Sequence, residues 1–158
     1  MKHFANQILL TLILLTSFSA QAAKLTVEDP WVRAGPPNAP ALAAFMNLVN
    51  HSADELSVIG AKTSLKVDRM ELHRTMMADG VMKMMPQESI PVAAHSSTLL
   101  KPGSWHIMMI KPAKVPVPGD MVKITLVLDN GEEQTVTAMV RKGMKMMHGD
   151  HDQNMKHD

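Results

Sequence analysis

The sequence predicts an all-β domain, a Greek-key β-barrel or sandwich, and three observations support this prediction. Ten prolines and eight glycines divide the chain into short runs of strand-forming residues. Met121–Leu128 ends in Asp129-Asn130-Gly131 and is followed by a second run of strand-forming residues, which is the turn chemistry of a β-hairpin. After the first 22 residues, no apolar pattern of helical period extends far enough to indicate a helix.

Nine strands are expected, each a short β-rich run that ends near a turn-forming residue. In chain order they are Leu25–Glu28, Ala43–Asn50, Glu55–Ala61, Val67–His73, Val81–Met85, Ser97–Leu100, Trp105–Ile110, Met121–Leu128 and Glu132–Val140. The spacing shows no internal repeat and no interdomain linker, so we expect one domain over residues 23–140.

The two ends of the chain differ from this pattern. Lys2, the apolar run Ile8–Phe18 and the small-residue motif Ala20-Gln21-Ala22 have the layout of a secretory signal peptide, assigned to residues 1–22. The apolar run is too short to span a bilayer, although an uncleaved N-terminal anchor remains the alternative. After cleavage we expect a periplasmic protein without stable membrane insertion. Residues 141–158 are polar and charged, and we expect a flexible, disordered tail.

Composition excludes several functions. A net charge of +1, from 16 Lys and Arg against 15 Asp and Glu, argues against a nucleic-acid partner. The absence of Cys excludes zinc-thiolate sites, iron–sulfur clusters, thiol nucleophiles and the Cys-ligated blue-copper centre. No sequence motif of a known catalytic site is present, so an enzyme is not expected. The 16 Met and eight His leave thioether and imidazole as the available soft-metal ligands.

The first candidate site segment is Glu71–Met85. Asp79-Gly80 predicts a two-residue hairpin turn, which pairs Ala78 with Val81 and Thr75 with Met84. His73 then lies on the same face as Met84, at a diagonal position within reach of a long side chain. A one-residue change in the loop would reverse this, and the methionines here could instead fill the core.

The second candidate is the triplet His106-Ile107-Met108, whose outer residues share one face of a strand. By itself the triplet is weak evidence, because a packed histidine beside a core methionine is common. Together the two segments supply His73, Met84, His106 and Met108. Four neutral ligands that include two thioethers favour Cu(I) over Zn(II), Mg(II) or Ca(II). The residues alone therefore indicate a candidate cuprous site.

The spacing H-x10-M-x21-H-x-M from His73 to Met108 resembles the motif of the periplasmic PCuAC copper-chaperone family. Other segments also resemble the sequences of this family, namely Asp29–Ala34, Asp79–Met84, Leu100–Gly103 and Gly119-Asp120. The resemblance covers about Leu25–Val140. It implies a cupredoxin-like β-barrel that binds Cu(I) near one edge and delivers copper to the dinuclear copper centre of cytochrome c oxidase. Some members carry Met two residues after the first His, where this chain has Thr75, so Met76 and Met77 are not assigned as ligands.

The tail adds a second set of soft and borderline ligands. These are Met144, Met146, Met147, His148, His151, Met155 and His157. We expect them to form a looser site that accepts Cu(II), although a solvated tail without a role is the alternative.

Three functions remain open from the sequence. The leading one is a metallochaperone, with a cytochrome c oxidase subunit or another copper-transfer protein as its partner. A periplasmic copper scavenger or storage protein would use the same ligands. A Met-rich β-sandwich interaction module would bind no Cu(I) in a stoichiometric titration.

Overall fold

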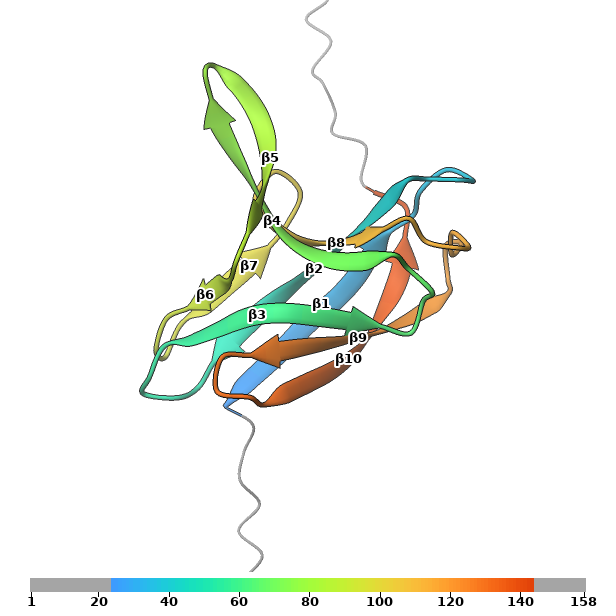
Figure 1. The fold of residues 1–158 in the computed structure, drawn as a ribbon. Helices are drawn as coiled ribbons and strands as arrows, with labels where there is room; N and C mark the ends of the chain where they lie inside the picture. Colours follow the sequence, from blue (N-terminus) through green and yellow to red (C-terminus); the bar gives the residue numbers. More distant parts are fainter. Residues whose placement is uncertain (1–23, 144–158) are drawn as a thin grey trace, which may run out of the picture.

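The computed structural model describes residues 24–143, and all regular structure in that range is β (Figure 1). The expected all-β, cupredoxin-like fold is confirmed. The ten strands of the described range are β1 Leu25–Arg33, β2 Ala41–Asn50, β3 Leu56–Thr63, β4 Arg69–Ala78, β5 Val81–Gln87, β6 Ile90–Val92, β7 Ser97–Leu100, β8 Trp105–Ile110, β9 Met121–Leu128 and β10 Glu133–Arg141. Between residues 24 and 143 no helix is long and apolar enough to cross a membrane. The signal-peptide and tail predictions concern residues largely outside the described range.

The strands pair in the order β5-β4-β8-β2-β1-β10-β9-β3-β6, and β7 pairs with β2 beyond the end of β8. Most pairs are antiparallel, whereas β1 and β10 are parallel. Strands β3 and β4 contact each other although they do not pair, so the sheet folds over on itself around the core. The strand β5 lies at one end of the path, and the β4–β5 hairpin projects from the body (Figure 1).

Alternation along the central strands builds the core. In β2 the side chains of Leu42, Ala44, Met46 and Leu48 are buried, and in β9 the same is true of Val122, Ile124, Leu126 and Leu128. Period-two burial of this kind is what a strand gives when one face is covered. The opposite face of β2 carries Ala41, Ala43 and Phe45, which leads toward the candidate site.

Two differences from the expected strands have clear causes. The first strand was expected to end at Glu28, but β1 continues to Arg33 past an irregularity between Glu28 and Trp31. Asp29 adopts a left-handed conformation, with φ of 42°, and Pro30 follows, so a turn-like dipeptide is accommodated within the strand as a bulge. The short β6 was not expected, because Pro91 lies within it; it pairs with β3 at the edge of the sheet, where proline is tolerated.

The β4–β5 turn depends on a glycine backbone conformation. Asp79 and Gly80 both have positive φ, 53° and 75°, as a type I′ hairpin turn requires. A side chain at Gly80 would meet nothing within 4 Å, so only backbone strain would oppose it.

We predict that Gly80→Ala destabilises the hairpin by about 1–2 kcal/mol, the cost of a left-handed conformation for an L-residue. Hydrogen exchange of the β4 and β5 amides measures this effect locally. Gly60→Ala is the control, because Gly60 has no positive φ and its added Cβ would make only ordinary contact at 3.9 Å. Equal protection of the hairpin amides in both variants would contradict the prediction.

Candidate metal centre

The pairing of β4 with β8 places the two candidate histidines directly opposite each other. His73 is the register partner of His106, and Glu71 is the partner of Met108. The two imidazole rings lie edge to face, with centroids 5.7 Å apart. Because directly opposed residues share a face of the sheet, His73, His106 and Met108 project to the same side.

The β4–β5 hairpin adds the second thioether. Thr75 pairs with Met84 and His73 pairs with Pro86, so the register predicted from the Asp79-Gly80 turn is confirmed. Met84 is therefore a diagonal neighbour of His73 on their common face. Pro86 lies on an edge strand, where its missing N–H costs no ladder hydrogen bond.

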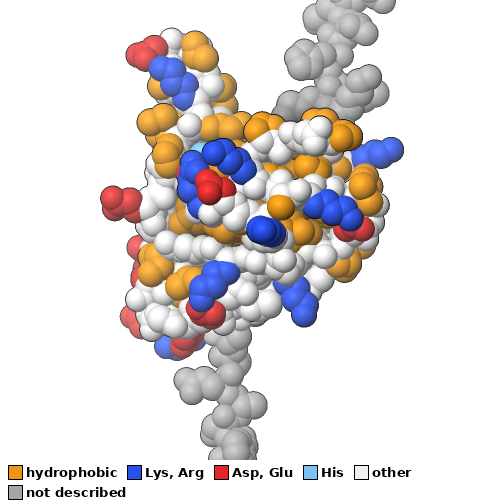
Figure 2. Space-filling view, turned by 45° about the vertical axis from the view of Figure 1, so that its right-hand side comes forward, with side chains coloured by type: hydrophobic (Ala, Val, Ile, Leu, Met, Phe, Trp, Pro, Cys, Tyr) orange, Lys and Arg blue, Asp and Glu red, His pale blue; other side chains and the backbone are white. Residues whose placement is uncertain are grey.

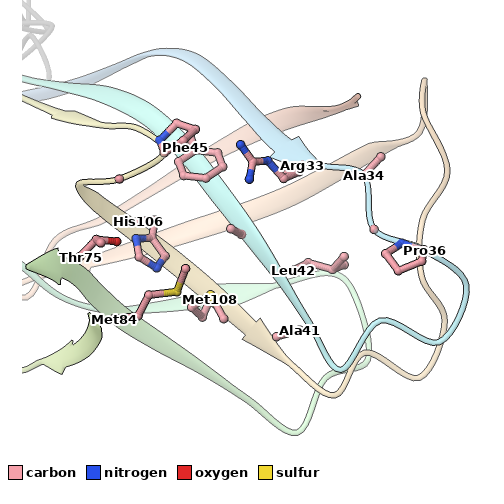
Figure 3. Close-up of a pocket in the computed structure, with 14 residues that line it drawn as sticks. Arg33, Ala34, Pro36, Ala41, Leu42, Phe45, Thr75, Met84, His106 and Met108 are labelled. Carbon is pink, nitrogen blue, oxygen red and sulfur yellow. The ribbon is translucent and has the colours of Figure 1, made fainter. Parts of the chain in front are cut away.

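A pocket opens on this face. Thr75, Met84, His106 and Met108 line it from β4, β5 and β8, and Ala43 and Phe45 from β2. Figure 3 shows Thr75, Met84, His106 and Met108 gathered at one end, whereas Ala41, Leu42 and Pro36 lie toward the other. His73 is not part of the pocket lining; it adjoins the pocket through its contact with His106.

His106 is held in one tautomer. Its Nδ1–H donates to the carbonyl oxygen of Ser104 at 2.9 Å, and a carbonyl can only accept. The Nε2 atom therefore carries the lone pair, and in the described part of the chain this buried atom has no hydrogen-bond partner. A buried polar atom without a partner costs about 1–3 kcal/mol. The Nε2 atom is therefore suited to coordinate a metal, because its lone pair is free and the hydrogen bond from Nδ1 to Ser104 fixes the orientation of the ring.

His73 is likewise left without hydrogen bonds. Neither of its ring nitrogens has a hydrogen-bond partner among residues 24–143, and its side chain is only 12% exposed. Glu71 Oε2 lies 3.0 Å from His73 Nε2, but this contact lacks the geometry of a hydrogen bond. Glu71 instead accepts a hydrogen bond from Arg69 Nε at 2.5 Å, and this guanidinium lowers the pKa of the carboxyl group. An ionised carboxylate thus lies next to the histidine pair.

An aromatic wall borders the histidines. Phe45 lies with its ring centroid 6.2 Å from that of His106, and Trp31 stacks on Phe45 at 4.6 Å. The Arg33 guanidinium lies 5.7 Å from the Phe45 ring centroid. Arg33 also lines the pocket, so the side of the pocket near His106 combines an aromatic ring with a guanidinium.

Sequence reasoning did not identify Ser104, Phe45 or Glu71 as part of this environment. Ser104 acts through its backbone carbonyl, which any residue would supply, so residue type carries no signal for it. From the sequence, Phe45 is expected to be an ordinary core residue, because it is large and apolar. Only the β2–β8 pairing shows that it faces the site. Glu71 could have been found, because it lies two residues before His73 and therefore on the same face of the strand.

The described residues 24–143 contain no cluster of three or more His, Asp or Glu that could hold a metal ion. The predicted tail ligands, Met144 to His157, lie outside the described residues.

The acid stability of the apoprotein follows from the burial of His106. Burial lowers the pKa of this imidazole, and the positive charge of a protonated His73 lowers it further, although the Ser104 carbonyl opposes both effects. The unfolded chain therefore binds the proton more readily, and stability falls as pH drops through the unfolded value of about 6.5.

We predict that the free energy of unfolding of the apoprotein decreases between about pH 7 and pH 5, as urea titrations at several pH values would show. His106→Gln keeps a side chain that can donate to Ser104 but removes the titrating group, so its pH dependence should be weaker. An unchanged pH dependence in this variant would assign the effect to other groups.

Comparison with known proteins identifies the family to which this sequence is similar. Residues 25–140 match the family model described as "Putative lipoprotein LpqE-like". A relative, "Putative lipoprotein Lxx21020" of Leifsonia xyli subsp. xyli, is 30% identical over 123 residues, which covers 77% of this chain and 72% of the relative.

Solved structures show the same architecture. The solution structure of CuI-DR1885 from Deinococcus radiodurans is 32% identical, with a TM-score of 0.61 over 80% of this chain and 84% of that one. The copper-bound PCuAC domain from PmoF2 is 23% identical and has a TM-score of 0.65, over 78% of this chain and 97% of that domain, which supports the fold. With its family model matched over residues 25–140, this chain belongs to the LpqE-like family.

Proposed function

We propose that this protein binds Cu(I) through His73, Met84, His106 and Met108 and acts as an extracytoplasmic copper chaperone. The observation that carries the proposal is the unpartnered, buried Nε2 atom of His106, in a pocket lined by the two thioethers and opposite an equally unpartnered His73. Two imidazoles and two thioethers form a donor set suited to a soft monovalent ion.

The surrounding charges agree with a monovalent cargo. The four ligands are neutral, and the nearest carboxylate to the pair, Glu71, already accepts a hydrogen bond from Arg69. One ionised carboxylate shared with a guanidinium leaves little negative charge to compensate a divalent ion. It also provides a hydrogen-bond acceptor that could orient His73 once the ring coordinates a metal.

The exposure of the ligands favours transfer over permanent storage. His106 is 3% exposed, whereas Met84 is 62% exposed and comes from the projecting hairpin. An incoming ligand from a partner protein can therefore displace Met84 while the histidines still hold the ion. A storage protein would instead gain from enclosing all four ligands.

The partner and location extend this proposal. We propose delivery to a cytochrome c oxidase subunit, at its dinuclear copper centre, or to another copper-transfer protein. Support for copper as the cargo comes from CuI-DR1885 of Deinococcus radiodurans, a Cu(I) form that is 32% identical to this chain. Residues 1–22 would direct the chain to the periplasm as a cleaved signal, and residues 23–140 would form the copper domain.

We predict that Met84→Leu and Met108→Leu each weaken Cu(I) binding by at least about tenfold, or about 1.4 kcal/mol, because a thioether donor is lost. Volume is nearly conserved, so stability should change little. Anaerobic titration against a chromophoric Cu(I) chelator measures the affinity. Met85→Leu is the control, since Met85 pairs with Arg74 and lies on the opposite face of the hairpin. Unchanged affinity in both site variants would refute the assigned site.

We also propose that residues 144–158 add a weaker Cu(II) site through His148, His151 and His157 beside the tail aspartates. A chain ending at Gly143 should lose most Cu(II) binding and keep Cu(I) affinity within about tenfold. The truncation must spare Arg141, which ends β10 and donates to Asp29 at 2.6 Å. Paramagnetic resonance of both forms with Cu(II) tests this; identical spectra and affinities would exclude the tail.

A further inference from the structure

The projecting β4–β5 hairpin exposes far more apolar surface than its pairing requires. Met77, Met82 and Met84 are 66%, 54% and 62% exposed, and Val81 at the turn is 58% exposed. Figure 2 shows hydrophobic side chains along the projection. Exposed apolar surface costs about 25 cal/mol per Å², so a row of large apolar side chains on a two-stranded projection invites a functional explanation.

The hairpin register sorts these methionines onto two faces. Met77 is the direct partner of Met82, and Met84 lies two residues farther along β5. All three share the face of His73 and Thr75, which leads to the pocket. Met76 and Met85 lie on the other face, where their partners are Lys83 and Arg74. Only one face of the hairpin therefore presents thioethers without a cation directly opposite.

The spacing on this face allows the three sulfurs to converge. The pair that closes a two-residue turn is hydrogen bonded, so the next pair, Met77 and Met82, is a non-hydrogen-bonded pair with Cα atoms about 4.5 Å apart. Met84 follows Met82 at about 7 Å along the strand. Met is unbranched, with three rotatable side-chain bonds, so these positions lie within its reach.

Within the described range, the face that carries Met77, Met82 and Met84 has no free carboxylate to bind a harder, divalent ion. The charged groups closest along the hairpin are Asp79 and Lys83, which form an ion pair with each other at 3.3 Å. Three thioethers without a free carboxylate or imidazole favour Cu(I) over divalent ions more strongly than the mixed set below them. They also remain unprotonated at any physiological pH, so protons do not compete for them.

We propose that Met77, Met82 and Met84 form an outer Cu(I) site that receives the ion and passes it to the buried histidines. This inference rests on the proposed function, because its destination is the four-residue site. Met84 belongs to both sets, so the ion can keep this bond during the transfer. The bonds from Met77 and Met82 break while those from His73, His106 and Met108 form, and copper remains Cu(I) throughout.

Two variants separate this role from a general effect of methionine on the hairpin. Met77→Leu/Met82→Leu removes two outer ligands and spares all four residues of the inner site. Met76→Leu/Met85→Leu changes the same number of methionines on the opposite face and is the matched control. Both keep apolar volume on the same two strands, so stability should change little.

The test measures loading kinetics and site occupancy on the full chain under anaerobic conditions. Cu(I) transfer from a chromophoric chelator is followed by stopped flow, and Ag(I) binding is followed through the ¹³C-labelled methionine methyl resonances. We expect Met77→Leu/Met82→Leu to slow loading by about tenfold while equilibrium affinity stays within about twofold. The control variant should load at the wild-type rate. In a His73→Gln/His106→Gln variant, whose inner site is disabled while Met84 stays free, the Met77 and Met82 methyl signals should shift on adding silver.

Equal loading rates in the two double variants would overturn the outer site, as would shifts of Met76 and Met85 that match those of Met77 and Met82. If transfer to an isolated recipient protein slows but loading from the chelator does not, the face docks a protein and does not bind copper. Failure of the proposed function has a different signature, in which the Met108 signal, which belongs to the inner site alone, does not respond to the first equivalent.

Discussion

The cross-strand pair of His73 with His106 is the contact on which the site depends, and the core fixes its register. The neighbouring pair in the same ladder, Leu72 with Ile107, is buried on the other face of the sheet. A slip of one residue in β4 would bring Leu72 to the open face and place His73 in the core. Hydrophobic burial on one side therefore specifies, without any metal, how the polar side chains meet on the other.

The parts of this arrangement that local chemistry encodes could be predicted from the sequence. Asp79-Gly80 specifies a type I′ turn, and a turn of fixed length specifies which residues face each other across the hairpin. The β4–β5 register, with Thr75 opposite Met84, therefore follows from two residues. The grouping of His73 with His106 could not be derived in this way, since 33 positions separate them. It came from the resemblance in spacing, and the β4–β8 pairing gives it a physical basis.

The features that sequence reasoning missed depend on contacts between distant segments or on the backbone. The bulge at Asp29 and Pro30 lets β1 continue to Arg33 and carry Trp31 against Phe45. The Ser104 carbonyl fixes the His106 tautomer although a serine side chain is not needed for it. Unpartnered nitrogens on two nearly buried histidines reduce the stability of the apoprotein, and such a local cost is typical of sites shaped for a ligand.

The solvent exposure of the four proposed ligands increases from the body of the sheet toward the projecting hairpin. The most buried donor, His106, is held from behind by Ser104 on β8, within the sheet, whereas the most exposed, Met84, comes from the edge strand β5 of a hairpin that leaves the body. Rigid, buried donors hold an ion in a defined geometry, and an exposed donor on the sheet edge can be exchanged without disturbing the core. A cargo ion needs both properties, because it must be held against solvent and yet be released to another protein. The same fold supplies both by extending two strands of its sheet beyond the domain that they help to build.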